Sequence, residues 1–186
     1  MFAIKRVMKK RHYYKGFTLV ELVVTLAVAS ILLSVAIPSF KDIIRNNRAT
    51  TYANQFIADL ALARSEAIKR GLPVFMTSKG SSSGDEWGNG WRVWADTNGN
   101  DIYDSGEEIK ETVQLQNEAT LGSNDTLTQI GFLSSGVVDL EAFAPSAPTE
   151  WPSTFQLRFD NCEKKQGRDI KLERTGRPST EKVYCT

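Results

Sequence analysis

A long apolar run near the start of the chain is the strongest pattern in the sequence. From Phe17 to Phe40 there are 24 residues, and the one charged residue among them is Glu21. A helix rises about 1.5 Å per residue, so a helix of this length can cross a hydrocarbon core roughly 30 Å thick. The pattern therefore predicts a transmembrane helix over residues 17–40.

The helical pattern continues beyond this run but becomes one-sided. Pro38 has no amide hydrogen and predicts a kink or local melting near Ser34. Residues 41–70 carry apolar side chains on one helical stripe, and Gly71 and Pro73 then end the helix. The stripe consists of Ala49, Tyr52, Ala53, Phe56, Ile57, Leu60, Ala63, Ala67 and Ile68. We expect this amphipathic helix to pack on the rest of a head domain over residues 41–186.

The remaining residues, 71–186, alternate short apolar segments with turn residues, which is typical of β-strands. The expected strands are Leu72–Thr77, Gly90–Ala95, Glu108–Leu115, Leu127–Phe132, Gly136–Leu140, Thr154–Phe159, Asp169–Leu172 and Glu181–Tyr184. Loops are expected over residues 79–86 and over residues 142–152, which contain three prolines. A long helix followed by antiparallel strands predicts an α+β fold in which β-sheet covers the helix stripe.

Basic residues gather at both ends of the chain. Residues 1–16 hold six Lys or Arg and no acid, which by the positive-inside rule places the N-terminus in the cytoplasm and the head outside. The whole chain has 23 basic and 22 acidic residues; without this leader, 17 basic residues face 22 acids. Residues 158–186 hold 8 basic and 5 acidic residues and are called the basic tail below.

The junction between the leader and the apolar run has a specific form. Gly16 precedes the run directly, and Glu21 is its fifth residue. This arrangement resembles the class III leader of type IV pilins and type II secretion pseudopilins, which often carry a proline where Pro38 stands. The resemblance implies cleavage between Gly16 and Phe17 by a prepilin peptidase and N-methylation of Phe17, with the head in the periplasm and the helix in the inner membrane.

An ordinary, uncleaved signal anchor is the alternative, but it gives no reason to place an acid in lipid. In pilins that acid has a partner. The resemblance implies that Glu21 pairs with the N-terminal ammonium of Phe17 on a neighbouring subunit, so that packing into a filament neutralises both charges.

The head also carries motifs of one pilin branch. Their residues are Trp91-x-Val93-x-x-Asp96-x-Asn98-Gly99-Asn100, Asp104-x-Gly106-Glu107 and Gly176-Arg177. They resemble the GspH/FimT family of minor subunits. That resemblance implies a structural subunit near a filament tip, which helps to start assembly and in some members binds DNA for uptake.

The segment from Asp96 to Glu107 has two interpretations. Oxygen-bearing side chains stand at EF-hand-like spacing, which predicts a calcium loop; they are Asp96, Asn98, Asn100, Asp104 and Glu107. Asp101, however, occupies the position where such a loop has glycine. The alternative is a hairpin tip whose side chains accept hydrogen bonds from nearby amides in Asx-turns.

The two cysteines, Cys162 and Cys185, make up the whole thiol inventory. A periplasmic location favours a disulfide between them, which would stabilise the chain by roughly 3–4 kcal/mol through loop closure; free buried thiols are the alternative. The only histidine, His12, lies in the leader. Histidine-assisted nucleophiles and histidine metal ligands are therefore unavailable to the processed chain, and we predict that it is not an enzyme.

Two functions fit these observations. The first is a structural subunit that helps to initiate or cap a type IV pilus or type II secretion pseudopilus. The second is a DNA receptor that contacts phosphates through the basic tail, using Lys164, Lys165, Arg168, Lys171, Arg174 and Arg177. DNA-binding family members carry Gly-Arg-x-Arg near this end, whereas this chain reads Gly176-Arg177-Pro178-Ser179.

Overall fold

One helix, α1 (Leu19–Arg70), runs through much of the computed structural model, which describes residues 16–80, 86–116, 119–140, 151–160, 162 and 164–185. The chain divides into two compact units, Met1–Lys41 and Asp42–Thr186, and α1 contributes to both. The leader before Gly16 and most of the two predicted loops lie outside the described residues.

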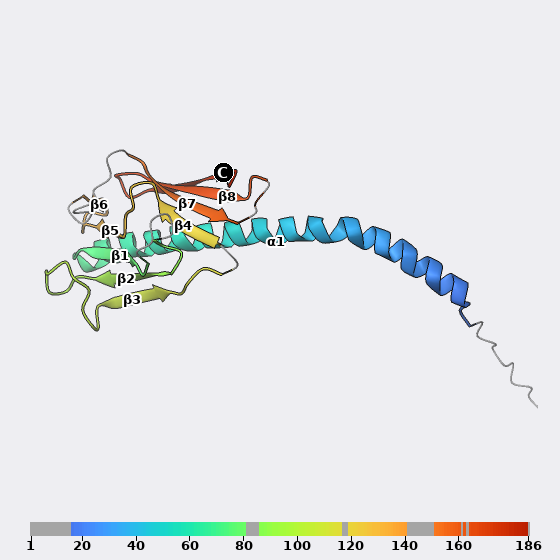
Figure 1. Ribbon diagram of the computed structural model, residues 1–186. Helices are drawn as coiled ribbons and strands as arrows, with labels where there is room; N and C mark the ends of the chain where they lie inside the picture. Colours follow the sequence, from blue (N-terminus) through green and yellow to red (C-terminus); the bar gives the residue numbers. More distant parts are fainter. Residues whose placement is uncertain are drawn as a thin grey trace, which may run out of the picture. The chain divides into compact units, whose positions relative to one another are not determined.

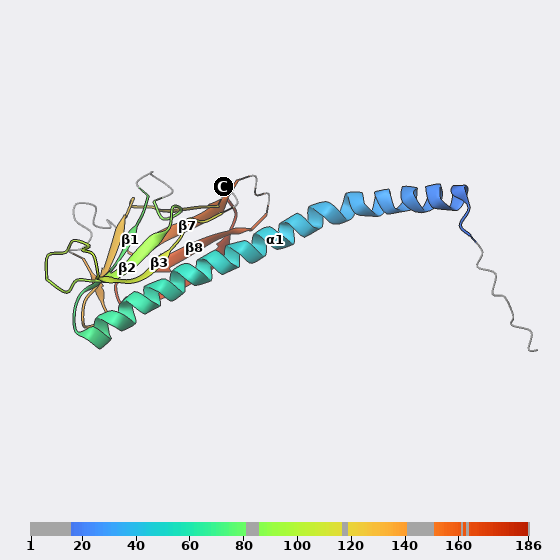
Figure 2. The ribbon, with the colours of Figure 1, turned by 90° about the horizontal axis from the view of Figure 1, so that it is seen from below.

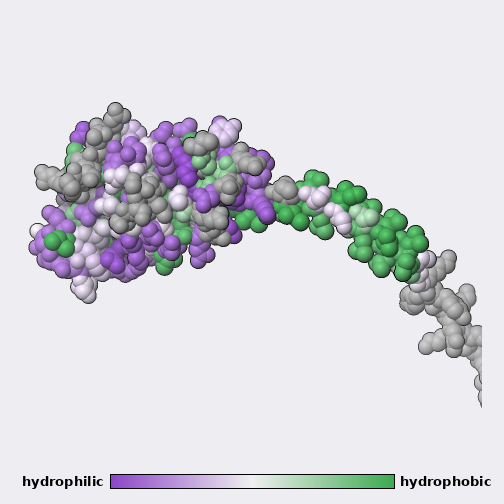
Figure 3. Space-filling view, in the orientation of Figure 1, coloured by the Kyte–Doolittle hydropathy of each residue, from purple (hydrophilic) through white to green (hydrophobic). Residues whose placement is uncertain are grey.

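In the first unit, most of the described side chains of α1 are apolar and exposed. Leu19 is 79% exposed and Ile31 is 68% exposed, and Figure 3 shows a mostly apolar surface along this part of the helix, with some paler patches. By length and composition α1 is apolar enough to cross a membrane. The local melting expected near Ser34 is not observed, because α1 continues through this position to Arg70.

In the second unit, α1 buries a narrow stripe of small and large apolar residues. The buried positions are spaced alternately by four and three residues: Ala49, Ala53, Phe56, Leu60, Ala63 and Ala67. Tyr52 and Ile57 lie partly buried at its margins. Ile68 was predicted on the stripe but is 53% exposed. Because most of the stripe is alanine, strands can approach the helix closely, while Phe56 and Leu60 fill the space between.

Two antiparallel sheets lie against the second half of α1 (Figures 1 and 2). The strands are β1 (Val74–Ser78), β2 (Trp91–Ala95), β3 (Glu108–Thr112), β4 (Ala119–Ser123), β5 (Gln129–Phe132), β6 (Val138–Asp139), β7 (Ser153–Phe159), β8 (Gly167–Leu172) and β9 (Pro178–Val183). One sheet has the order β3-β2-β1-β5-β6 and the other β4-β7-β8-β9. This is the predicted α+β layout, with the sheet surface divided in two.

One strand was missed and one was misplaced. The sequence of β4 offers one large apolar residue, Leu121, and no strand was predicted there; its pairing with β7 buries it. Strand β9 was expected over Glu181–Tyr184 but runs over Pro178–Val183. It is an edge strand with mostly exposed side chains, so its hydrophobic alternation is weak, and proline is tolerated at its first residue.

Phe56 is the point at which the helix meets both sheets. Its ring centroid lies 5.2 Å from that of Trp91 in β2, 5.1 Å from that of Phe155 in β7 and 5.3 Å from that of Trp87. All four rings are fully buried. Edge-to-face aromatic contacts of this kind add to the free energy gained from burial.

We predict that Phe56→Ala lowers the free energy of unfolding of the head by about 3–5 kcal/mol, because it removes a buried ring and leaves a cavity between the two sheets. Urea unfolding of the full chain in detergent, followed by tryptophan fluorescence, measures this change. Ile68→Ala on the same helix is the control and should cost less than about 1 kcal/mol. Equal losses in the two variants would contradict the role given to Phe56.

Candidate assembly segment and charged sites

The start of α1 is closed by a reciprocal pair of hydrogen bonds. The backbone N–H of Glu21 donates to the Thr18 hydroxyl at 3.2 Å, and the backbone N–H of Thr18 donates to Glu21 Oε2 at 3.4 Å. This is a capping box, in which two side chains satisfy amides that have no partner within the helix. The sequence Thr18-x-x-Glu21 carries the signature, which the sequence analysis did not use.

The segment before the helix is open to an external partner. Gly16 and Phe17 are exposed, and a Cβ atom added to Gly16 would meet no atom within 4 Å. Packing within the described residues therefore does not require glycine at this position. The Glu21 carboxylate is also exposed, so a second partner can approach it while the capping hydrogen bonds hold it near the helix start.

The loop between β2 and β3 is built on two carboxylates. Asp96 accepts hydrogen bonds from the backbone N–H groups of Gly99, Asn100 and Asp101, at 2.7–3.2 Å. Glu107 accepts from the backbone N–H and hydroxyl of Thr97 and from the backbone N–H of Asp104.

The other predicted calcium ligands are bonded to one another. The amides of Asn98 and Asn100 both donate to Asp104 Oδ2, at 2.8 and 2.9 Å. The hydrogen bonds match the hairpin-tip interpretation, in which these side chains satisfy nearby amides. Among the described residues, no group of three or more His, Cys, Asp or Glu has the geometry of a metal site.

These contacts lower the pKa values of Asp96 and Glu107. Burial opposes the ionisation of Asp96, but the N–H groups of Asp101, Gly99 and Asn100 outweigh it and hold its pKa below the ordinary 3.8. Hydrogen bonds from the backbone and hydroxyl of Thr97 likewise lower the pKa of Glu107 from 4.5. Both carboxylates are therefore ionised at neutral pH and bind the loop together.

The six residues predicted to contact DNA do not form one patch. Lys164 and Lys165 precede β8, whereas Arg174 and Arg177 lie in the turn after it. Lys171 is paired with Glu181 at 2.8 Å, which raises the pKa of the lysine. In the described part of the chain, no observation favours a DNA site over a set of separately engaged cations.

Arg168 is a structural residue, contrary to the prediction that it contacts DNA. It is 8% exposed, and its guanidinium donates to Asn46 Oδ1 at 2.9 Å and to Thr50 Oγ1 at 3.0 Å. It also donates to the carbonyls of Gln166 and Gly167. The guanidinium therefore joins β8 to α1 and is not available to a phosphate.

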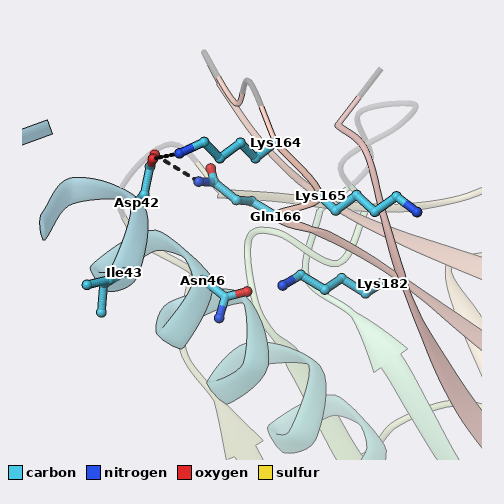
Figure 4. A pocket seen from close by; sticks show the side chains of 7 residues that line it. All are labelled: Asp42, Ile43, Asn46, Lys164, Lys165, Gln166 and Lys182. Atoms are coloured by element: carbon cyan, nitrogen blue, oxygen red, sulfur yellow. Dashed lines mark hydrogen bonds and ion pairs between the residues drawn. The ribbon is translucent and has the colours of Figure 1, made fainter. Parts of the chain in front are cut away.

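A pocket of about 350 Å³ lies where the start of the head helix meets the chain before β8 and the end of β9. We call it the lysine pocket; it is lined by Asp42, Ile43, Asn46, Lys164, Lys165, Gln166 and Lys182. Figure 4 shows Lys164 and Gln166 pointing toward Asp42, with donor–acceptor distances of 2.5 and 3.0 Å. The sequence analysis missed Asp42, Asn46, Gln166 and Lys182, because no local motif links positions so far apart.

A disulfide joins Cys162 to Cys185, as predicted from the redox environment. It connects the segment before β8 with the segment after β9, so it closes the outer hairpin of the second sheet. Two walls of the lysine pocket are thereby held together by a covalent bond.

We predict that the stabilisation from Asp96 disappears in acid. A folded-state pKa below the unfolded value means that the carboxylate stabilises the fold above about pH 4 and that this contribution is lost as the pH falls through the folded value. At pH 7, Asp96→Asn should lower the free energy of unfolding by about 1–2 kcal/mol, and this difference from wild type should shrink as the pH falls below about 4. Urea unfolding at each pH tests this.

Asp101→Asn, on the same loop, is the control for Asp96→Asn. Its exposed side chain should change the free energy of unfolding by less than about 0.5 kcal/mol at any pH. If the difference in free energy of unfolding between wild type and Asp96→Asn does not change with pH, the role given to the Asp96 charge is wrong.

Solved structures with the same fold are filament subunits. The type IV minor pilin FimU of Pseudomonas aeruginosa in space group P21 aligns with a TM-score of 0.55 and 21% identity, over 75% of this chain and 96% of that chain. The minor pseudopilin EpsH from the type 2 secretion system of Vibrio cholerae aligns with a TM-score of 0.50 and 16% identity, over 73% and 97%. No curated protein sequence matches.

Family models match both parts of the sequence. The prokaryotic N-terminal methylation motif matches residues 11–37, which contain the leader junction and most of the apolar run. The model of the type II transport protein GspH matches residues 52–176, about two thirds of the chain. Family and fold are those of structural subunits, not enzymes. The chain belongs to the GspH family and is a minor pilin or pseudopilin of a type IV pilus or type II secretion system.

Proposed function

We propose that the chain is a single-pass inner-membrane subunit that is cut between Gly16 and Phe17 and then helps to initiate or cap a filament. The basic leader stays in the cytoplasm, residues 17–40 span the membrane, and the head lies in the periplasm. The match to the methylation motif and the apolar, exposed surface of the first part of α1 support this arrangement.

The observation that carries the proposal is the single carboxylate of the apolar run. An acid within a transmembrane segment costs free energy of insertion, so its presence indicates a function. Glu21 is exposed and bonded to the first turn of its own helix, one turn from Phe17. After cleavage, the ammonium of Phe17 on a neighbouring subunit is the partner that neutralises it during assembly.

The leader junction supports processing by an enzyme that requires glycine. Among the described residues, nothing would contact a side chain at Gly16, so in this proposal the requirement for a small residue comes from a partner that binds this junction. Prepilin peptidase is that partner in the family, and other pilins or pseudopilins are the partners of the processed helix.

We predict that the mature protein begins at an N-methylated Phe17. Gly16→Ala should still be processed, whereas Gly16→Leu should leave the leader attached, because a bulky side chain obstructs the peptidase. Intact-mass spectrometry of protein purified from membranes with and without the peptidase measures both. Met1 retained in wild-type protein from assembled filaments would rule out this processing.

We also predict that Glu21 acts through its charge. Glu21→Gln keeps a capping side chain but cannot pair with an ammonium, so it should enter the membrane normally and enter filaments at least about tenfold less than wild type. Thr18→Ala removes the cap and keeps the charge, and it should assemble. Quantitative immunoblotting of sheared filaments and of membranes compares the variants. Normal incorporation of Glu21→Gln would contradict the proposal.

A further inference from the structure

The lysine pocket combines a concave shape with a concentration of positive charge. Three of its seven lining residues are lysines, from the segment before β8 and from β9, and its helix side carries Asn46. Arg45 adds a further cation beside it and donates to Gln166 Oε1 at 3.3 Å. The pocket has a volume of about 350 Å³ and is shallow and open to solvent.

Fixed contacts hold the framework of the pocket and leave ammonium groups at its opening. Lys164 and Gln166 both donate to Asp42, the one acid among the described residues of the lining, so that carboxylate is occupied within the protein. Figure 4 shows Lys182 extending toward Asn46. In the same view the Lys165 side chain extends away from Asp42 and Lys182, and its ammonium lies over the Tyr184 ring, 5.3 Å from the ring centroid. The pocket therefore presents cationic donors of the kind that bind a phosphate oxygen.

The pocket begins almost where the apolar run ends. Asp42 is two residues after Phe40, and a chain reaches at most about 3.6 Å per residue, so the two Cα atoms lie within roughly 7 Å of each other. The headgroup layer on each side of a bilayer is roughly 5–8 Å thick. Wherever the apolar run ends at the hydrocarbon boundary, this wall of the pocket is therefore at the depth of lipid phosphates.

We propose that the lysine pocket binds the phosphate of an anionic phospholipid in the outer leaflet of the inner membrane and holds the head against the membrane before assembly. The inference rests on the proposed anchoring of residues 17–40. The ligand is a phosphodiester tethered to the bilayer: Lys182 contacts its oxygens from within the pocket, and Lys165 turns from the Tyr184 ring to join it.

The position of the pocket favours lipid over the other phosphate sources. Free phosphate gains nothing from the neighbouring apolar run, whereas a phospholipid is already concentrated at that boundary. Duplex DNA needs an extended row of cations, whereas Arg174 and Arg177 lie at the other end of β8 from the lysine pocket.

Native mass spectrometry of the full chain tests this inference. The protein is released from neutral detergent micelles that contain equimolar phosphatidylglycerol and phosphatidylcholine, and the ratio of the two lipid adducts is measured. A basic residue near an anionic lipid favours it roughly fivefold. Lys165→Gln/Lys182→Gln should therefore lower the phosphatidylglycerol preference by at least about fivefold relative to wild type.

Three arms make the result specific. Arg174→Gln/Arg177→Gln removes two cations from the other end of β8 and should keep the wild-type ratio; Lys165→Arg/Lys182→Arg keeps the charge and should stay within about twofold of it. All variants carry the same residues outside the substituted positions, so lipid contacts made by other basic residues contribute equally to each adduct ratio and do not affect the comparison with wild type. Inorganic phosphate at 20 mM should leave the adduct ratio nearly unchanged. If the preference for phosphatidylglycerol disappears when phosphate is added, the pocket binds free phosphate instead.

Other outcomes would overturn the proposal. Equal adduct ratios for wild type and Lys165→Gln/Lys182→Gln would exclude a lipid site; if that variant then failed to enter filaments, the pocket would be a contact with a neighbouring subunit. Alkaline extraction of membranes tests anchoring separately. A chain that resists extraction but shows no lipid preference contradicts only this inference, whereas a chain that is extracted contradicts the proposed function as well.

Discussion

The fold depends on one helix whose two halves lie in different environments, an apolar one for the first half and the interior of the head domain for the second. For its first part α1 must be apolar on every side, whereas from Ala49 onward it must be apolar on one stripe and polar elsewhere. The stripe can support two sheets because it is narrow and mostly alanine, which brings strands close, and because Phe56 reaches into both. A wider stripe would leave apolar surface uncovered by the strands, and a stripe of large residues would hold the sheets apart.

A buried acid fixes how the helix sits on the first sheet. Asp59 is 1% exposed and accepts hydrogen bonds from Trp91 Nε1 and Thr112 Oγ1, both at 2.9 Å, and from Lys110 Nζ at 2.5 Å. A buried carboxylate is tolerated only where donors replace its water. Aromatic packing around Phe56 is permissive about small shifts, whereas these three directed contacts from β2 and β3 specify one register of helix and sheet.

Features encoded locally were predictable from the sequence, and long-range pairings were not. The helix, most strands and the junction at Gly16 and Glu21 follow from periodicity and a short motif. The division into two sheets and strand β4 depend on partners distant in the chain, as β4 pairs with β7. The same limit explains the charged sites, because Lys164 meets Asp42 across 122 positions and nothing near either residue marks the pairing.

The basic tail shows how composition alone can mislead about a surface. It has 8 basic residues against 5 acids, which suggests a polyanion site. Four of those cations are held by the fold: Arg158 pairs with Asp169, Lys171 with Glu181 and Lys164 with Asp42, and Arg168 is buried against α1. The contacts of Lys164 and Arg168 attach the second sheet to the start of the head helix, whereas the other two ion pairs and the disulfide lie within that sheet and its flanking segments. Half of the cations in the tail are therefore paired with acids or buried, and the other four, Lys165, Lys182, Arg174 and Arg177, are divided between the lysine pocket and the far turn of β8 and β9.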